Sequence, residues 1–183
     1  EVLGQIADAV AHIHNRGIVH GDIKADNIML VETLDGTRKK LVVRLLDFGL
    51  ARRKDNPTDE TGPVTGSPHY LAPERIVSGE PTIAADIYAL GVLAYLLIAG
   101  SLPFQGTLAE ILAAHANERA PSPTWKRDTN TIRSLDNLIG RAMSKDPRLR
   151  HPSAEAFRYE LNTVMDMSAL TTRRRTSQNL KPL

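Results

Sequence analysis

The sequence predicts a mainly α-helical fold with one small β-hairpin. Several segments place apolar residues at intervals of three and four, the period of a helix that buries one face. Two short runs of β-branched and aliphatic residues flank an Asp-Gly pair, which is the pattern of a hairpin. The composition, 42% hydrophobic and 24% charged, is typical of a globular chain. At about 150 residues per domain, the 183 residues make one domain with a short remainder.

The chain begins with a predicted helix that leads into a polar loop. Residues 2–14 space Val, Leu, Ile and Ala along one helix face, and Asn15-Arg16-Gly17 is a typical C-terminal stop. Ile18-Val19 is predicted to be a short extended piece. The segment HGDIKADN at residues 20–27 then interrupts the apolar pattern with charged and amide side chains.

A hairpin and a long loop are predicted next. The runs Ile28–Val31 and Leu41–Leu46 are apolar and short, and Asp35-Gly36 between them favours a turn. From Ala51 to Gly66 the periodicity is lost, and Thr, Pro, Asp, Arg and Lys accumulate. We expect a long polar loop over that segment.

The most apolar stretch of the chain, residues 83–99, is predicted to be a buried helix. Its uninterrupted apolar run from Ile87 to Gly100 has 14 residues, fewer than the roughly 20 that a bilayer requires. Asp86 near its start and a Gly-Ser-Leu-Pro sequence at its end fit a helix that is surrounded by protein. We therefore expect no membrane span in this chain.

Three further helices and a tail complete the predicted fold. The helices are expected near residues 107–117, 134–144 and 153–166, with Ser153 as the N-cap of the last. The remaining expectations are a folded unit over residues 1–168 and a basic, disordered tail over 169–183, which carries Arg173-Arg174-Arg175 and no apolar period.

The composition excludes several classes of function. Without cysteine, the chain has no disulfide, no cysteine-bound zinc and no thiol catalysis. A net charge of +2 is too balanced to indicate a nucleic-acid partner. No signal peptide is visible after Glu1, and a chain free of cysteine suits a reducing compartment, so we expect a cytoplasmic location.

The polar loops around the predicted hairpin carry the residues suited to chemistry. Asp22, Asp26, Asn27 and Asp47 supply three carboxylates and an amide, and the two ends of a hairpin converge. Such oxygen ligands suit a hard cation such as Mg²⁺ that carries phosphate. Lys24, two residues after Asp22, could hold a phosphate oxygen beside a carboxylate that accepts a hydroxyl proton. Asp and Asn also abound in ordinary turns, so residue types alone leave both interpretations open.

Six motifs resemble the protein kinase signature set and stand in its order. Three are H-x-D-x-K-x-x-N at residues 20–27, D-F-G at 47–49 and A-P-E at 72–74. The others resemble the substrate-docking loop, the start of the central buried helix, and the segment whose last Arg pairs with the A-P-E Glu: G-S-P-H-Y at 66–70, D-I-Y-A-L-G at 86–91 and D-P-R-L-R at 146–150. The resemblance spans about 130 residues and implies a protein-kinase-like fold, of which this chain is the C-terminal lobe.

The resemblance implies a role for each matching residue. Asp22 would accept the proton of the acceptor hydroxyl, and Lys24 would steady the γ-phosphate, as in Ser/Thr rather than Tyr kinases. Asn27 and Asp47 would hold Mg²⁺. The residues expected around ATP are Lys24, Asp26, Asn27, Met29 and Asp47, with Met29 under the adenine ring.

Other matching residues are expected to shape the site. Ser67, in the substrate loop, would hydrogen-bond beside the catalytic pair. Glu74 and Arg150 would form a structural ion pair, and Asp86 would anchor the backbone of the catalytic loop. Two residues are expected to pack and to hydrogen-bond within the fold rather than to react, namely His20 and Phe48.

One departure from the family pattern concerns regulation. Where the family carries H-R-D, the Arg helps to bind a phosphate on the activation loop, and this chain has Gly21 at that position. Thr58, Thr61 and Thr65 could still be phosphorylated, but the cationic side chain that would receive the phosphate is missing from position 21. We therefore expect activity that does not require activation-loop phosphate.

A second departure is that none of the 183 residues forms a Gly-rich phosphate loop, a V-A-I-K lysine or its helical Glu partner. In the family these features precede the helix that residues 2–14 match. We therefore expect a C-terminal lobe that needs an N-terminal lobe as its partner and that alone binds ATP poorly and is inactive. The face toward that lobe should expose Met29, Leu46 and Phe48.

The resemblance implies part of a Ser/Thr protein kinase, which transfers the γ-phosphate of ATP to Ser or Thr hydroxyls of a protein substrate with Mg²⁺ as cofactor. A pseudokinase that serves as a scaffold is the non-enzymatic alternative. Small-molecule kinases of the aminoglycoside phosphotransferase type share H-G-D-x-x-x-x-N, but they lack the A-P-E segment and the docking loop. The S-A-E-A-F sequence at 153–157 resembles bacterial Ser/Thr kinases.

Overall fold

The computed structural model describes residues 1–53, 66–123 and 130–178. Within these ranges the chain is mostly helical, and two small antiparallel sheets lie between the first helix and the others in the sequence, which confirms the predicted fold class. The elements are α1 (Val2–His14), β1 (Ile18–Val19), η1 (Ala25–Asn27), β2 (Ile28–Asp35), β3 (Arg38–Leu45), β4 (Arg52–Arg53), η2 (Pro68–Tyr70), α2 (Pro73–Ser78), α3 (Ile83–Ala99), α4 (Leu108–Asn117), α5 (Asn130–Ala142), η3 (Pro147–Leu149) and α6 (Ala154–Gln178).

Helix α3 is the centre of the fold, and its bounds are those that the sequence predicts. Its N-cap is Thr82, whose hydroxyl accepts a hydrogen bond from the Ala85 N–H at 3.0 Å. It ends at Gly100, which adopts the left-handed conformation that favours glycine. Residues 85–95 are all buried, so neighbouring elements cover the helix on every side, as expected. None of the helices that the structure describes is long and apolar enough to cross a membrane.

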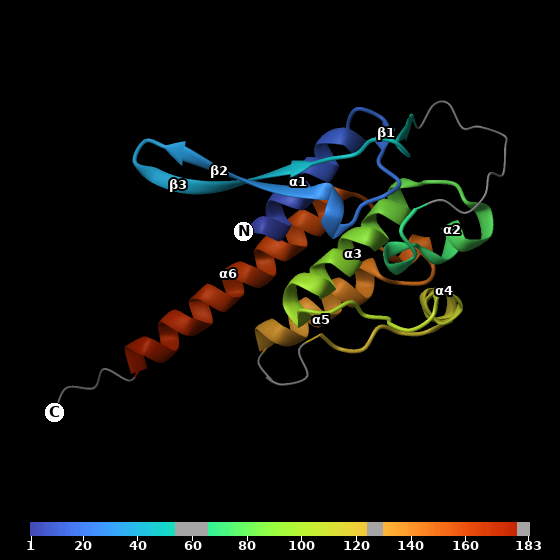
Figure 1. Cartoon of the computed structure of the whole chain (residues 1–183). Helices are drawn as coiled ribbons and strands as arrows, with labels where there is room; N and C mark the ends of the chain where they lie inside the picture. Colours follow the sequence, from blue (N-terminus) through green and yellow to red (C-terminus); the bar gives the residue numbers. More distant parts are fainter. Residues whose placement is uncertain (54–65, 124–129, 179–183) are drawn as a thin grey trace.

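Helices α1 and α5 pack against α3, and α6 packs against α1 and α5 and closes the core (Figure 1). Helix α1 lies along the first part of α6, and α5 packs against both α3 and α6. The shorter helices α2 and α4 pack against each other beside this bundle. The largest side chains of the core are fully buried and come from α1, α3, α5 and α6, among them Ile6, Tyr88, Leu90, Leu138 and Phe157.

Strands β2 and β3 form the predicted hairpin, which projects beyond the helices in Figure 1. The hairpin is longer than predicted, because it is paired continuously from Ile28 with Leu45 to Asp35 with Arg38. Helix α1 holds one side of it, since the Gln5 side-chain amide exchanges hydrogen bonds with the backbone of β3. The hairpin therefore packs on α1 through β3 and extends away from the core.

The long loop expected over Ala51–Gly66 begins instead with a strand. Arg52 and Arg53 form β4 and pair with Val19 and Ile18 of β1. A two-residue strand that pairs with a segment more than thirty residues earlier leaves no periodic signal in the sequence. Thr58, Thr61 and Thr65 lie outside the described residues.

The helices at the C-terminal end differ from the prediction in their bounds. Helix α5 begins at Asn130, four residues before the predicted start. Helix α6 is capped by Ser153 as predicted, through a hydrogen bond from the Ala156 N–H to the Ser153 hydroxyl. Residues 169–178, which the sequence analysis assigns to the tail, continue α6 as far as Gln178. Ala169, Leu170, three arginines and Gln178 favour helix in this segment, so a helix started by its packed first half continues without an apolar face.

Candidate active site

The candidate active site is built on the polar loop between β1 and β2, and its centre is the carboxylate of Asp22. Its Oδ1 accepts a hydrogen bond from the Ser67 backbone N–H at 3.0 Å. Its Oδ2 lies 2.8 Å from the Lys24 ammonium and accepts a hydrogen bond from the Asn27 amide at 3.3 Å. Three partners from two separate segments of the chain therefore hold this one carboxylate.

The partners of Asp22 determine which form of its side chain is favoured. Burial raises the pKa of Asp22, but the hydrogen bonds and charge of Lys24 and the bonds from Ser67 outweigh it, so the pKa lies below its ordinary value. The bond to Asp22 raises the pKa of Lys24, and the carboxylates of Asp26 and Asp47 add to this effect. The structure thus favours an ionised Asp22 carboxylate beside a protonated Lys24, and the carboxylates of Asp26 and Asp47 lie near that lysine.

Asn27 and Asp47 flank the base of the hairpin, as the sequence predicts. The Asn27 carbonyl accepts a hydrogen bond from the Leu46 N–H at 2.8 Å, which brings the residue before Asp47 next to Asn27. The Asn27 amide nitrogen donates to the Asp22 carbonyl at 2.8 Å as well as to its carboxylate, so its amide oxygen is the atom suited to a cation.

Asp47 has an unusual backbone conformation. Its φ of 57° is in the left-handed region, which Asp tolerates better than most residues. The Gly49 N–H donates to Asp47 Oδ1 at 3.0 Å and stabilises this turn. Such conformations often mark functional positions.

The oxygen donors of Asn27 and Asp47 fit Mg²⁺, which prefers oxygen ligands and retains water and phosphate around it. Among the described residues, no three His, Cys, Asp or Glu side chains gather closely enough to hold a metal ion by themselves. A cation bound here would therefore complete its coordination with phosphate oxygens and water.

Asp86 holds the backbone at the start of the polar loop of residues 20–27, the expected catalytic loop. This residue is only 2% exposed and stands in the first turn of α3. Its carboxylate accepts hydrogen bonds from the backbone N–H groups of His20 at 2.8 Å and Gly21 at 2.9 Å. His14 of α1 contacts the same carboxylate through Nε2 at 2.9 Å. The expected anchor is present, and the contact with His14 is one that the sequence did not indicate.

The other residues of the loop lie as follows. His20 is fully buried, accepts the Asp22 N–H at its Nδ1 and faces the Leu46 carbonyl with its Nε2, which fits the tautomer protonated at Nε2. The Phe48 ring packs on it with the centroids 5.0 Å apart. Asp26 is exposed in η1. Met29 is 45% exposed on β2.

The apolar face expected beside the site is present in part. Met29 and Phe48, at 45% and 47%, are exposed, whereas Leu46 is half-buried. Leu30 and Leu41 of the hairpin are also exposed, at 49% and 45%. Several large apolar side chains therefore meet solvent close to the site.

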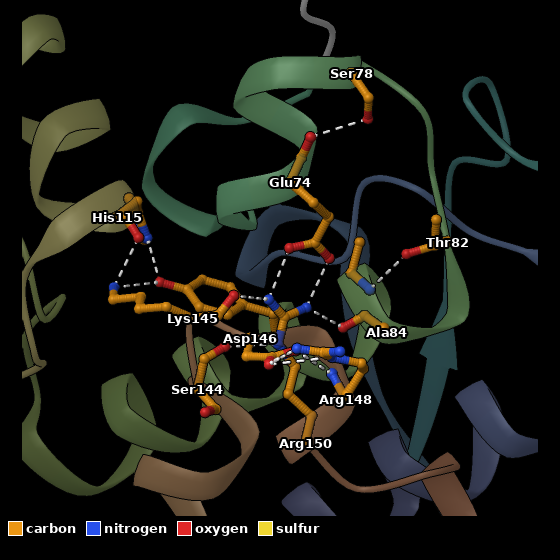
Figure 2. A network of polar contacts seen from close by, with 12 residues as sticks. Glu74, Ser78, Thr82, Ala84, His115, Ser144, Lys145, Asp146, Arg148 and Arg150 are labelled. Atoms are coloured by element: carbon orange, nitrogen blue, oxygen red, sulfur yellow. Dashed lines mark hydrogen bonds and ion pairs between the residues drawn. The ribbon is translucent and has the colours of Figure 1, made fainter.

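The expected Glu74–Arg150 ion pair joins α2 to the segment before α6 (Figure 2). Both guanidinium nitrogens Nη1 and Nη2 donate to the two carboxylate oxygens, each at 2.7 Å. Arg150 also donates to the carbonyls of Ala84 and Ser144, and its guanidinium lies over the Tyr88 ring. Because its side chain is completely buried, these contacts replace all of its hydration.

Lys145 forms a second, half-buried cationic centre in the same network, one that the sequence did not indicate (Figure 2). Its ammonium donates to the carbonyls of His115 at 2.7 Å and Ala114 at 3.2 Å, and so caps the end of α4. Burial and the charge of Arg150 lower the pKa of Lys145 to about 8. The Tyr88 hydroxyl lies 2.8 Å from Nδ1 of His115, so α3, α4 and the segment before α6 are tied together.

Arg75 is a further buried charge that sequence reasoning missed. It follows the A-P-E segment and donates to the carbonyl of Gly21 in the catalytic loop. His14 and Arg75 are both in contact with this loop, yet each lies in an ordinary helical stretch. Only the tertiary contacts distinguish them from surface residues.

Comparison with known proteins supports these motifs. The family described as protein kinase domain matches residues 1–161. The chain is 39% identical over 178 residues to serine/threonine-protein kinase Pkn1 of Myxococcus xanthus, with 96% of this chain and 25% of that protein covered. It is 36% identical over 179 residues to serine/threonine-protein kinase PrkC of Bacillus subtilis, with 97% and 26% covered. It is also 36% identical over 155 residues to serine/threonine-protein kinase PknD of Mycobacterium tuberculosis, with 84% and 22% covered.

All three of these relatives come from bacteria, which confirms the expected resemblance to bacterial enzymes. The chain spans about a quarter of their length.

Proposed function

The chain belongs to the protein kinase domain family, and from that premise we propose that the protein transfers the γ-phosphate of ATP to Ser or Thr hydroxyls of protein substrates. Its relatives named above are serine/threonine-protein kinases, which supports this choice of acceptor. The observation that carries the proposal is the Asp22 carboxylate, held in its ionised form by Lys24, Asn27 and Ser67.

In the proposed reaction, Asp22 accepts the proton of the acceptor hydroxyl as its oxygen forms a bond to the γ-phosphorus. The bond between the γ-phosphorus and the bridging oxygen of ATP breaks, and ADP leaves with that oxygen. Lys24, next to Asp22, holds an oxygen of the transferred group and offsets its charge. Met29 lies on the apolar face where it could support the adenine ring.

Asn27 and Asp47 are the residues that would hold Mg²⁺, with Asp26 nearby in η1. When bound, the cation would neutralise part of the phosphate charge. The part of the protein in this step is to keep the amide oxygen of Asn27 and the carboxylate of Asp47 at the base of one hairpin.

The test is phosphate transfer from MgATP to a generic protein acceptor by the full-length protein, with Asp22→Asn compared with native sequence. We expect the variant to lose at least a hundredfold in kcat, because general-base catalysis contributes about 10² to 10⁴. Asp35→Asn, in the exposed hairpin turn, is the matched control and should retain the native rate.

Two outcomes would contradict the proposal. No transfer by folded native protein with any protein acceptor would favour a scaffold without activity. Equal rates for native and Asp22→Asn would remove Asp22 as the base. An acceptor that is a small molecule is disfavoured by η2 and α2, which form the docking segment and the A-P-E helix beside Asp22.

We further propose that residues 1–168 act as the C-terminal lobe and that this chain alone binds MgATP weakly. None of its residues forms a Gly-rich loop, and the hairpin exposes apolar side chains such as Leu30 and Leu41 instead of covering a nucleotide. Calorimetry on the 183-residue chain should give a dissociation constant weaker than about 1 mM, and a micromolar value would contradict this prediction.

A further inference from the structure

Arg75 is a cation almost wholly removed from solvent, at 4% exposure, next to the catalytic loop. Its Nη1 donates to the carbonyl of Gly21, one residue before Asp22. Its Nε and Nη2 donate to the carbonyl of Gly79, at 3.4 and 3.2 Å, where α2 ends. One side chain thus spans from the end of α2 to the catalytic loop.

The guanidinium of Arg75 also reaches the segment that binds Asp22 from the other side. A side chain built at Gly66 would meet Nη1 of Arg75 at 3.4 Å and Oδ1 of Asp22 at 3.6 Å. The residue after it, Ser67, donates its N–H to that Oδ1. The docking segment, the Asp22 carboxylate and Arg75 therefore lie close together.

The peptide groups around Gly21 are held by charges on both sides. Its N–H donates to the Asp86 carboxylate, and its carbonyl accepts from Arg75. These two buried charges fix the orientation of the backbone immediately before Asp22. Burying a charged side chain carries a larger desolvation cost than burying an apolar side chain of the same size. A buried charge therefore adds little to stability unless its hydrogen bonds have good geometry.

Position 21 itself has no room for the arginine of the family motif. Gly21 has a φ of +79°, which side chains other than glycine rarely adopt. A side chain built there would approach Pro81 Cβ at 3.0 Å and the Leu50 carbonyl at 3.1 Å. In this chain a cation from α2, Arg75, contacts the catalytic loop through the carbonyl of Gly21.

We propose that Arg75 is a positioning residue that clamps the catalytic loop to the docking segment and so orients Asp22 without a bound phosphate. This proposal rests on the proposed function, in which Asp22 is the base. The guanidinium is suited to the task because it offers donors in several directions at once and remains charged when buried. A lysine would keep the charge but could not reach both carbonyls with the same geometry.

The first test is amide hydrogen exchange on the 183-residue chain, which needs no catalytic activity. In Arg75→Met, the amides of Gly21, Asp22 and Ser67 should exchange at least tenfold faster than in the native chain. Those of Leu90 and its neighbours in α3 should be unchanged. Arg16→Gln is the matched control, because Arg16 follows α1 and donates at the surface to a carbonyl in the last turn of that helix.

Two results would overturn the proposal at this stage. Unchanged exchange at Gly21 and Asp22 would mean that Arg75 does not hold the loop. An equal rise at Leu90 would mean that Arg75 only stabilises the whole fold. If Arg75→Met does not fold, Arg75→Lys takes its place, and it should raise exchange in the loop without raising it in α3.

The second test is the rate of the full-length protein with MgATP and a generic protein acceptor. Arg75→Met should lower kcat at least tenfold while the KM for ATP changes less than twofold, because misplacing a catalytic group costs rate rather than nucleotide binding. Arg75→Lys should recover part of the loss. A rise in KM alone, or native kcat in Arg75→Met, would overturn the proposal.

The two tests separate this proposal from the proposed function. If Asp22→Asn leaves transfer unchanged, the proposed base is wrong whatever Arg75 does. If Asp22→Asn abolishes transfer while Arg75→Met leaves both kcat and exchange unchanged, only the clamp is wrong.

Discussion

At the scale of single residues, Gly21 shows how a change in one side chain alters the expected regulation. The sequence indicates only that a phosphate-binding cation is missing from this position. The structure adds that the backbone there is left-handed and that Pro81 and the Leu50 carbonyl fill the adjacent space. The glycine is therefore required by the local conformation.

A direct prediction concerns Gly21→Ala. The left-handed backbone costs about 1–2 kcal/mol for a residue with Cβ, and the close approach to Pro81 adds to this. The free energy of unfolding, measured with urea, should therefore fall by more than about 1 kcal/mol. Gly17→Ala is the control, because Gly17 has a φ of +70° but no atom within 4 Å of the added Cβ. Equal losses in the two variants would show that the contacts around Gly21 contribute nothing.

A second prediction tests independence from activation-loop phosphate. Replacing Thr58, Thr61 and Thr65 together by Ala in the full-length protein should leave kcat within about twofold of native, because position 21 offers no cation to receive a phosphate. The measurement is phosphate transfer to a generic acceptor after the native protein has been incubated with ATP. A hundredfold drop would contradict this expectation.

Sequence motifs predicted the residues around Asp22 better than they predicted what supports them. Lys24 and Asn27 lie beside Asp22 because a short loop sets their spacing, and Ser67 and Asp86 contact this loop although they lie far along the chain, in motifs of their own. The supports Arg75 and His14 come from helices far away in the chain, and no local pattern marks a polar helical side chain that turns inward. The catalytic roles themselves stay predictions.

At the scale of elements, the Glu74–Arg150 ion pair holds α2 against the segment before α6. The pair is bidentate, and the side chain of Arg150 is fully buried. Glu74→Gln would leave that guanidinium without its counter-charge, so the free energy of unfolding should fall by about 3–5 kcal/mol. Urea unfolding of the 183-residue chain measures this.

The control for this prediction is Glu32→Gln, which breaks the exposed pair with Lys39 on the hairpin and should cost less than about 1 kcal/mol. A loss in Glu74→Gln no larger than that of the control would show that α2 is held by other contacts.

The sequence predicted the elements with strong periodicity and misjudged those without it. Helix α3 and the β2–β3 hairpin were confirmed because continuous apolar runs and an Asp-Gly turn are local signals. Strand β4 was missed because it exists only through pairing with β1. The length of α6 was underestimated because helix propensity, rather than an apolar face, continues it to Gln178.

At the scale of the whole molecule, the buried His115 makes the fold sensitive to acid. Burial and the charge of Lys145 lower the pKa of His115 from 6.5 to about 4. Between these two values the unfolded chain binds a proton that the folded chain does not, so stability falls as pH drops through this window. The full effect is about 3 kcal/mol.

The measurement is urea unfolding of the native chain and of His115→Gln at pH 7 and pH 4.5. Between pH 7 and pH 4.5 the free energy of unfolding should fall by about 2–3 kcal/mol more in the native chain than in the variant. The comparison with the variant removes the contribution of the other titrating groups. Equal losses would show that His115 does not govern the acid response, despite its contacts with Tyr88 and Lys145.

The carboxylate of Asp86 has a consequence for how the protein folds. It belongs to the first turn of α3, yet it holds backbone groups 65 and 66 residues earlier in the chain. Closing a loop of that length costs entropy that only the docking of the central helix repays. We therefore expect the catalytic loop to gain its shape together with the core and not to persist in a partly folded intermediate. Activity and global structure should vanish in one cooperative transition, which leaves a damaged molecule inert instead of partly active.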